Sequence, residues 1–125
     1  MVQPAETVKI FQKQSEFKTY SAGEVIFTEG EYGEHMYGIV SGEVDLYVDG
    51  KAVETIQQGD VFGEGALVTP ERTRASTAIA KTNCELAFIN RQGFLFAVQE
   101  TPIFALQVMR SYSERLRRFK HPVGS

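Results

Sequence analysis

The chain has 125 residues, enough for one ordinary domain, which at this size buries about two thirds of the surface that its unfolded chain exposes. Its composition is 42% hydrophobic and 23% charged, so it is typical neither of a disordered chain nor of a membrane protein. A net charge of −3 gives no overall attraction to nucleic acid, and no apolar run approaches the roughly 18 to 20 residues that cross a bilayer.

The sequence lacks the features of a secreted protein. Its N-terminus does not have the basic and then apolar order of a secretory signal, and the single cysteine, Cys84, excludes an internal disulfide. We therefore expect a folded, cytoplasmic protein in which Cys84 is a small buried side chain. One domain is expected over residues 1–125, with a β-roll at about 17–90 and C-terminal helices at about 91–120.

A short helix after Pro4 is the first predicted element, because proline is tolerated in the first turn of a helix. From residue 17 to residue 90 the sequence changes to short β-branched and aromatic runs cut by glycines, a pattern typical of strands. The expected strands are residues 24–27, 36–40, 44–48, 52–56, 75–80 and 84–89. Asp49 and Gly50 predict a hairpin between two of them, since an Asp-Gly pair supplies the positive φ angles of a type I′ turn.

The regular spacing of these short strands favours a sandwich, barrel or jelly roll over a parallel sheet. The fold class is therefore mainly β with flanking helices. Several glycines in the strand region are interpreted as turn residues without ligand contact, namely Gly23, Gly30, Gly33, Gly42 and Gly59.

Two helices are expected after residue 90, a short one at 92–98 and a longer one that starts at Thr101 and Pro102. An apolar stripe with alternating spacings of four and three runs along the longer helix, formed by Ala105, Met109, Tyr112, Leu116 and Phe119. The stripe has to pack on something, either the core or a second subunit. The cations in the last turns are interpreted as a solvated helix end that complements the helix dipole, namely Arg115, Arg117, Arg118 and Lys120.

Residues 59–67 and the loop that carries Arg74 offer an anion site. Gly63 and Gly65 allow backbone N–H groups to approach a ligand closely, and a short helical turn that begins near Gly65 directs amides toward it. The Arg74 guanidinium adds charge-assisted hydrogen bonds to phosphate oxygens, and the Glu64 carboxylate accepts one from a sugar hydroxyl. Such groups suit a ligand with one phosphate and one ribose, and we expect Arg74 and Glu64 to face each other across a hollow.

Residues 62–67 and the pair Arg74-Ala75 resemble a known motif, Phe-Gly-Glu-x-Ala-Leu followed by an arginine and a small residue. It is the phosphate-binding cassette of the cyclic-nucleotide-binding domains of the catabolite activator protein, protein kinase A regulatory subunits and cyclic-nucleotide-gated channels. Residues 20–27, 29–37 and 41–44 also resemble the structural turns and strands of this family. The resemblance implies a double-stranded β-helix, or jelly roll, with a short N-terminal helix and C-terminal helices.

The resemblance also implies the ligand contacts. They are Phe62, Gly63, Glu64, Gly65, Ala66, Arg74, Ala75 and Ser76, with Leu46, Val53 and Phe119 as further contacts to the base. In this scheme Arg74 pairs with the cyclic phosphate and Glu64 holds the ribose 2′-hydroxyl. Ala75 favours cAMP over cGMP, because members that prefer cGMP tend to have threonine there.

The sequence departs from the family pattern at two places. Gly65 stands where relatives often carry an apolar residue, and no helix-turn-helix segment follows Lys120. We therefore expect no binding to nucleic acid by this chain alone and no contact with membranes. Transmission through the C-terminal helix to a partner protein, or within a homodimer, is expected instead.

Two other functions have to be weighed against a nucleotide sensor. An enzyme of the cupin type needs several converging histidines and carboxylates, and only two histidines occur, so we expect no catalysis, no metal and no cofactor other than the nucleotide ligand. The second alternative is an interaction or scaffold protein that has kept the fold but does not bind cyclic nucleotide.

Overall fold

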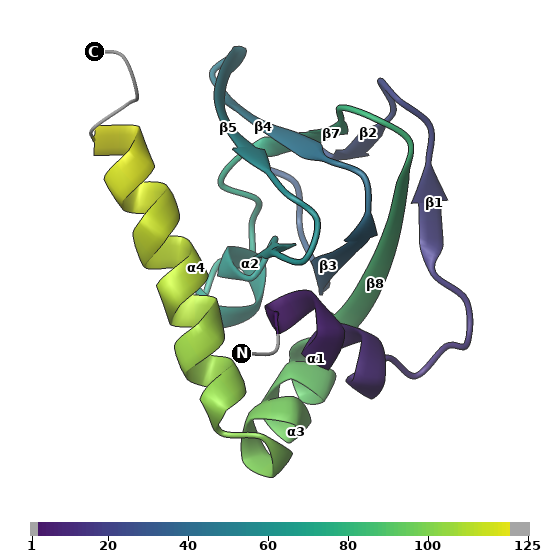
Figure 1. The fold of residues 1–125 in the computed structure, drawn as a ribbon. Coiled ribbons are helices and arrows are strands. Elements are labelled where there is room, and N and C mark those ends of the chain that lie inside the picture. The colour runs from purple at the N-terminus through teal and green to yellow at the C-terminus, as the bar shows by residue number, and fades with distance from the viewer. Residues whose placement is uncertain (1–2, 121–125) are drawn as a thin grey trace.

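The computed structural model describes residues 3–120, which form a roll of two four-stranded antiparallel sheets. Figure 1 shows the N-terminal helix and the first C-terminal helix at one end of the roll, and the long last helix running along one side of it. In chain order the elements are α1 (Pro4–Phe11), β1 (Lys18–Tyr20), β2 (Val25–Phe27), β3 (His35–Ser41), β4 (Val44–Val48), β5 (Lys51–Ile56), β6 (Val61–Phe62), α2 (Gly65–Val68), β7 (Thr77–Ala80), β8 (Cys84–Asn90), α3 (Arg91–Glu100) and α4 (Ile103–Lys120). The prediction of a jelly roll with flanking helices is confirmed.

The two sheets have the strand orders β1-β8-β3-β6 and β2-β7-β4-β5. Apart from the β4–β5 hairpin, neighbours in both sheets lie far apart in sequence, as in the pairing of Met36 with Ile89 between β3 and β8. All six predicted strands are present, but the strand expected at 75–80 begins only at Thr77. β1 and β6 were not predicted, because runs of three and two residues are too short to show an alternating pattern.

The hairpin between β4 and β5 confirms the predicted turn. Asp49 and Gly50 both have positive φ, 51° and 78°, as a type I′ turn requires. This turn sets the register in which Val48 pairs with Lys51, and an irregularity between Leu46 and Tyr47 then shifts the register by one residue, so that Val44 pairs with Ile56.

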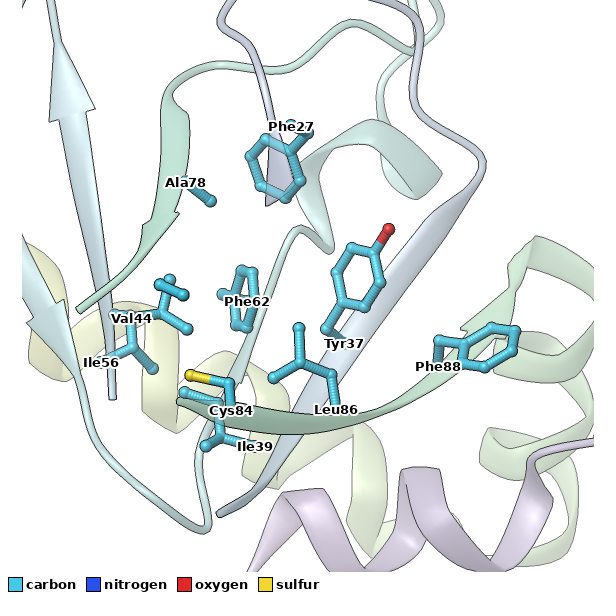
Figure 2. Packing of buried hydrophobic residues seen from close by; sticks show 11 residues of the cluster. Phe27, Tyr37, Ile39, Val44, Ile56, Phe62, Ala78, Cys84, Leu86 and Phe88 are labelled. Atoms are coloured by element: carbon cyan, nitrogen blue, oxygen red, sulfur yellow. The ribbon is translucent and has the colours of Figure 1, made fainter. Parts of the chain in front are cut away.

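An aromatic cluster fills the space between the sheets (Figure 2). The rings of Tyr37 and Phe62 stack with centroids 5.3 Å apart, and Phe27 lies 5.9 Å from Phe62. Aliphatic side chains and Cys84 surround these rings, and Cys84 is only 3% exposed, as predicted. A second apolar cluster lies between β3, β8 and the helices, where Met36 and Phe104 are fully buried.

The C-terminal helices differ in detail from the prediction. The Asn90 side chain caps α3 by accepting a hydrogen bond from the amide of Gly93. Thr101 and Pro102 form a turn in which the Thr101 carbonyl accepts from the amide of Phe104, and α4 begins one residue after Pro102. No helix within residues 3–120 has both the length and the hydropathy that a membrane crossing requires.

The apolar stripe of α4 does not pack on the roll. Phe104 and Val108 are buried against the second cluster, so a neighbouring face of the helix makes the contact. Met109, Tyr112 and Phe119 are 59%, 59% and 62% exposed. The stripe is thus an exposed apolar face of the described chain, and it is not part of the core.

Candidate functional site

The motif that resembles a phosphate-binding cassette, residues 62–67, lies at the turn between β6 and α2. Gly63 has a φ of 82°, which a side chain would strain, and this conformation brings its carbonyl to Arg74. Glu64 is the N-cap residue of α2, which begins at Gly65 as expected. The first amides of a helix have no acceptor within the helix, so this turn has N–H groups available for an anion.

Arg74 is buried, with 6% of its surface exposed. Its Nη1 donates to the Gly63 carbonyl at 2.9 Å and its Nη2 donates to the His35 carbonyl at 2.8 Å. The guanidinium carbon lies 4.0 Å from the centroid of Phe27, and this cation–π contact joins the arginine to the aromatic cluster. These contacts hold the guanidinium in one position.

The Arg74 charge has no carboxylate partner among the described residues. Among residues 3–120 it makes no ion pair, and its buried Nε has no hydrogen-bond acceptor. Burial lowers the pKa of Arg74, while Tyr37, Glu31 and Glu64 act in the opposite direction. A guanidinium stays protonated even so, and a buried cation without a counterion is costly. An anion placed here would offset that cost.

Glu64 is also buried, with 7% of its surface exposed, but it does have a partner. Its Oε1 accepts a hydrogen bond from Arg115 of α4, whereas its Oε2 has no partner among the described residues. Burial raises the pKa of Glu64, and the nearby Arg115 charge counteracts only part of this rise. The carboxylate therefore joins the cassette to α4 and keeps one oxygen available.

Arg115 is the residue of the candidate site that the sequence pattern did not identify. It was interpreted as part of a solvated helix end, but its side chain is only 11% exposed and also donates to the Val61 carbonyl. The signal that points to it is helical phase, because Phe104, Val108, Ser111 and Arg115 follow spacings of four, three and four on one face of α4. That face contacts the roll as α4 passes α2 (Figure 1).

The expectation that Arg74 and Glu64 face each other across one hollow needs correction. Arg74 lines a cavity of about 250 Å³ together with Phe27, Tyr37 and the carboxylate-bearing Glu31, and Glu64 is not among its lining residues. The two groups are connected through the backbone, because the carbonyl that Arg74 holds belongs to the residue before Glu64. The Glu64 carboxylate was expected to accept a hydrogen bond from a sugar hydroxyl, but one of its oxygens accepts from Arg115.

The remaining predicted contacts have varied surroundings. Phe62 and Ala66 are buried, Leu46, Val53 and Ser76 are half-buried, and Gly65, Ala75 and Phe119 are exposed. Arg72, the other arginine of the loop, lies 5.3 Å from the Tyr32 ring, outside the cassette. Within residues 3–120 no group of three or more metal-ligating side chains is arranged to hold a metal ion.

The chain was compared with known proteins. The family model described as cyclic nucleotide-binding domain matches residues 17–101. A cAMP-dependent protein kinase regulatory subunit of Aspergillus niger is 37% identical over 95 residues, covering 74% of this chain and 23% of the relative. A cGMP-dependent protein kinase of Plasmodium berghei is 36% identical over 91 residues, covering 71% of this chain and 10% of the kinase.

The fold is also similar to that of a solved regulator. The catabolite activator protein of Thermus thermophilus superposes with a TM-score of 0.76 at 24% identity, over 94% of this chain and 55% of the regulator. The chain thus spans about a quarter of the fungal relative and about a tenth of the kinase. Because the family model covers more than half of the chain, the protein belongs to the family of cyclic nucleotide-binding domains.

Proposed function

We propose that this chain is a regulatory module that binds cAMP in preference to cGMP and transmits binding through α4. The observation that carries the proposal is the buried Arg74 guanidinium, which has no ion-pair partner among the described residues. The module itself has no catalytic role in this proposal and needs no metal or cofactor. A cytoplasmic location is part of the proposal and rests on the sequence.

Two buried polar atoms match the two polar ends of a cyclic nucleotide. Arg74 Nε is a donor without an acceptor, and Glu64 Oε2 is an acceptor without a donor. In the proposed complex a phosphate oxygen accepts from the first and a ribose hydroxyl donates to the second. Both atoms are enclosed and do not line one cavity, so binding requires the surrounding side chains to move. Each buried polar atom left without a partner costs about 1 to 3 kcal/mol, so a ligand that supplies both partners recovers a substantial free energy.

The preference for cAMP is supported by Ala75, because the family resemblance associates a threonine at this position with cGMP. The related proteins include a kinase subunit named for cAMP and a kinase named for cGMP, so relatedness by itself does not distinguish the two nucleotides. Ala75 is exposed beside the buried Arg74, where a nucleotide substituent can reach it.

Transmission is proposed to run from the ribose through Glu64 and Arg115 to α4. Polar contacts hold this helix on the roll: Ser111 to Asp60, Arg115 to Glu64 and Arg118 to Glu54. Only the middle contact includes a residue expected to bind the ligand. A nucleotide that bonds the second oxygen of Glu64 stabilises the helix position in which Arg115 holds the first, and so shifts the population toward that position.

Titration of the chain with cAMP and cGMP tests the proposal. We expect cAMP to bind with micromolar or tighter affinity and cGMP more weakly, as measured by calorimetry together with the shift in melting temperature. If neither nucleotide gives heat or a thermal shift at millimolar concentration, the proposal is wrong and the chain is an interaction protein that keeps the fold without the ligand.

The exposed stripe of α4 is proposed as a homodimer interface, through which ligand binding in one copy affects the other copy. Its spacings of four and three, along Met109, Tyr112, Leu116 and Phe119, are those of a coiled-coil seam. Apolar side chains of this size, exposed in a continuous row, mark an interaction site on a folded domain.

Leu116→Glu is expected to convert the dimer to a monomer. In the seam the two copies of the new carboxylate would repel each other and would lose their hydration. Light scattering over a range of concentrations measures the mass. Arg117→Glu, at an exposed position farther round the same helix from the stripe, serves as the control and is expected to keep the dimer mass. A wild-type mass equal to one chain at every concentration contradicts self-association through this stripe.

A further inference from the structure

Gly33 lies next to the Arg74 side chain, and its role is not that of a turn residue. Gly33 is buried in the loop between β2 and β3, and its φ is not in the left-handed region, unlike that of Gly30 nearby. Any residue can therefore adopt its backbone conformation. The interpretation of Gly33 as a turn glycine is wrong, and its lack of a side chain has another cause.

The lack of room around residue 33 explains why it has no side chain. A Cβ atom placed on Gly33 would lie 2.5 Å from Cζ of Arg74, closer still to Nε, and 2.8 Å from the Ala66 Cβ. Non-bonded carbon atoms prefer separations of about 3.5 to 4.0 Å, so neither contact can be accommodated as it stands. The guanidinium occupies a slot between Gly33 on one side and the aromatic ring of Phe27 on the other.

The backbone around this slot is fixed by hydrogen bonds. The amide of Gly33 donates to the Arg72 carbonyl at 2.8 Å, and the amide of Arg74 donates to the Glu31 carbonyl at 2.8 Å. The amide of Gly30 in turn donates to the Arg74 carbonyl at 2.8 Å. The two loops are thus paired along their length and cannot separate easily, so a methyl group at residue 33 has to displace the Arg74 side chain.

We propose that Gly33 is a positioning residue for nucleotide binding, since its missing side chain leaves the slot that holds the Arg74 guanidinium at the phosphate site. This inference rests on the proposed function and extends it to a residue outside the cassette. A displaced guanidinium loses its bonds to the carbonyls of Gly63 and His35, which hold it beside the cassette. Gly33→Ala is therefore expected to resemble the loss of Arg74 itself.

The test combines Gly33→Ala and Arg74→Ala in a double-mutant cycle. Gly33→Ala alone is expected to weaken cAMP binding by about 10- to 150-fold, the range expected for loss of a charge-assisted contact, and to add little once Arg74 is already alanine. Gly50→Ala, at the hairpin tip where nothing lies within 4 Å, costs stability through its positive φ but leaves affinity unchanged.

Thermal unfolding without nucleotide provides a second measurement, which does not depend on binding. Gly33→Ala is expected to lower the melting temperature when Arg74 is present, and to lower it much less when Arg74 is alanine. An equal loss in both backgrounds overturns the proposal, because the collision is then with Ala66 or the backbone. If Gly33→Ala does not fold, folding of the double variant supports the proposal and its failure to fold contradicts it. Absence of cAMP binding in the wild type rejects the proposed function, whereas the unfolding cycle still tests the slot.

Discussion

Arg74→Ala is expected to weaken cAMP binding by about 10- to 150-fold, which corresponds to the roughly 1.5 to 3 kcal/mol of a hydrogen bond to a charged group. The physical reason is that the guanidinium is already buried and held by two carbonyls. The protein meets the cost of desolvating and orienting it during folding, so little of that cost is left for the binding step. Calorimetric titration of wild type and variant measures the difference.

Arg72→Ala provides the control for this experiment. Arg72 has the same charge two residues earlier in the loop, but it lies against the Tyr32 ring and outside the cassette. The control is expected to keep cAMP affinity within a few-fold of wild type. Equal losses in the two variants would mean that the arginines act through general charge attraction, and the assignment of the phosphate to Arg74 would fail.

Arg115→Ala is expected to destabilise the protein by about 3 to 5 kcal/mol near neutral pH, because it leaves the Glu64 carboxylate buried without its cation. Chemical denaturation followed by circular dichroism measures the free energy of unfolding. Arg117→Ala, on an exposed residue of the same helix, is the matched control and is expected to change stability by less than about 0.5 kcal/mol. A comparably small loss for Arg115→Ala would show that the pair does not anchor α4.

The pH dependence of this loss follows from the raised pKa of Glu64. Burial lifts the pKa of this carboxyl above its ordinary value of 4.5, so the folded state binds a proton more tightly than the unfolded state. The contribution of Glu64 to stability is therefore fully present below the unfolded pKa and decreases as pH rises through the folded pKa. Loss of Arg115 raises the folded pKa further and widens this window.

The penalty for Arg115→Ala is accordingly expected to shrink as pH falls through the folded pKa of Glu64, and to be smallest below the ordinary pKa, where the carboxyl is neutral in both states. Glu64→Gln is the reference, since an amide does not titrate, and Arg115→Ala in that background is expected to have no such dependence on pH. A penalty that is the same at acidic and neutral pH would show that Arg115 stabilises α4 by packing and not by its charge.

Local sequence was sufficient to predict the parts of the fold that depend on near neighbours. Asp49 and Gly50 determine their own turn, and the run from Phe62 to Ala66 determines the cassette because backbone geometry and a short motif specify both. β1 and β6 escaped prediction because they are defined by partners far along the chain, as Lys18 is by Leu86.

The candidate site was predictable only in part, for a related reason. Arg115 lies 51 residues after Glu64, and nothing in the cassette indicates which residue of α4 meets the carboxylate. Gly33 likewise has a local pattern that resembles a turn, and its role appears only when the Arg74 side chain is placed beside it. Contacts between distant segments decide both roles.

The ion pairs along α4 differ in their access to water, and dissolved salt will act on them unequally. Arg118 is 47% exposed in its pair with Glu54, whereas the side chains of Arg115 and Glu64 are 11% and 10% exposed. Mobile ions screen accessible charges over about 10 Å at moderate ionic strength but reach enclosed charges poorly. The tip of α4 is thus held in a way that depends on ionic strength, while its attachment one turn earlier resists such screening.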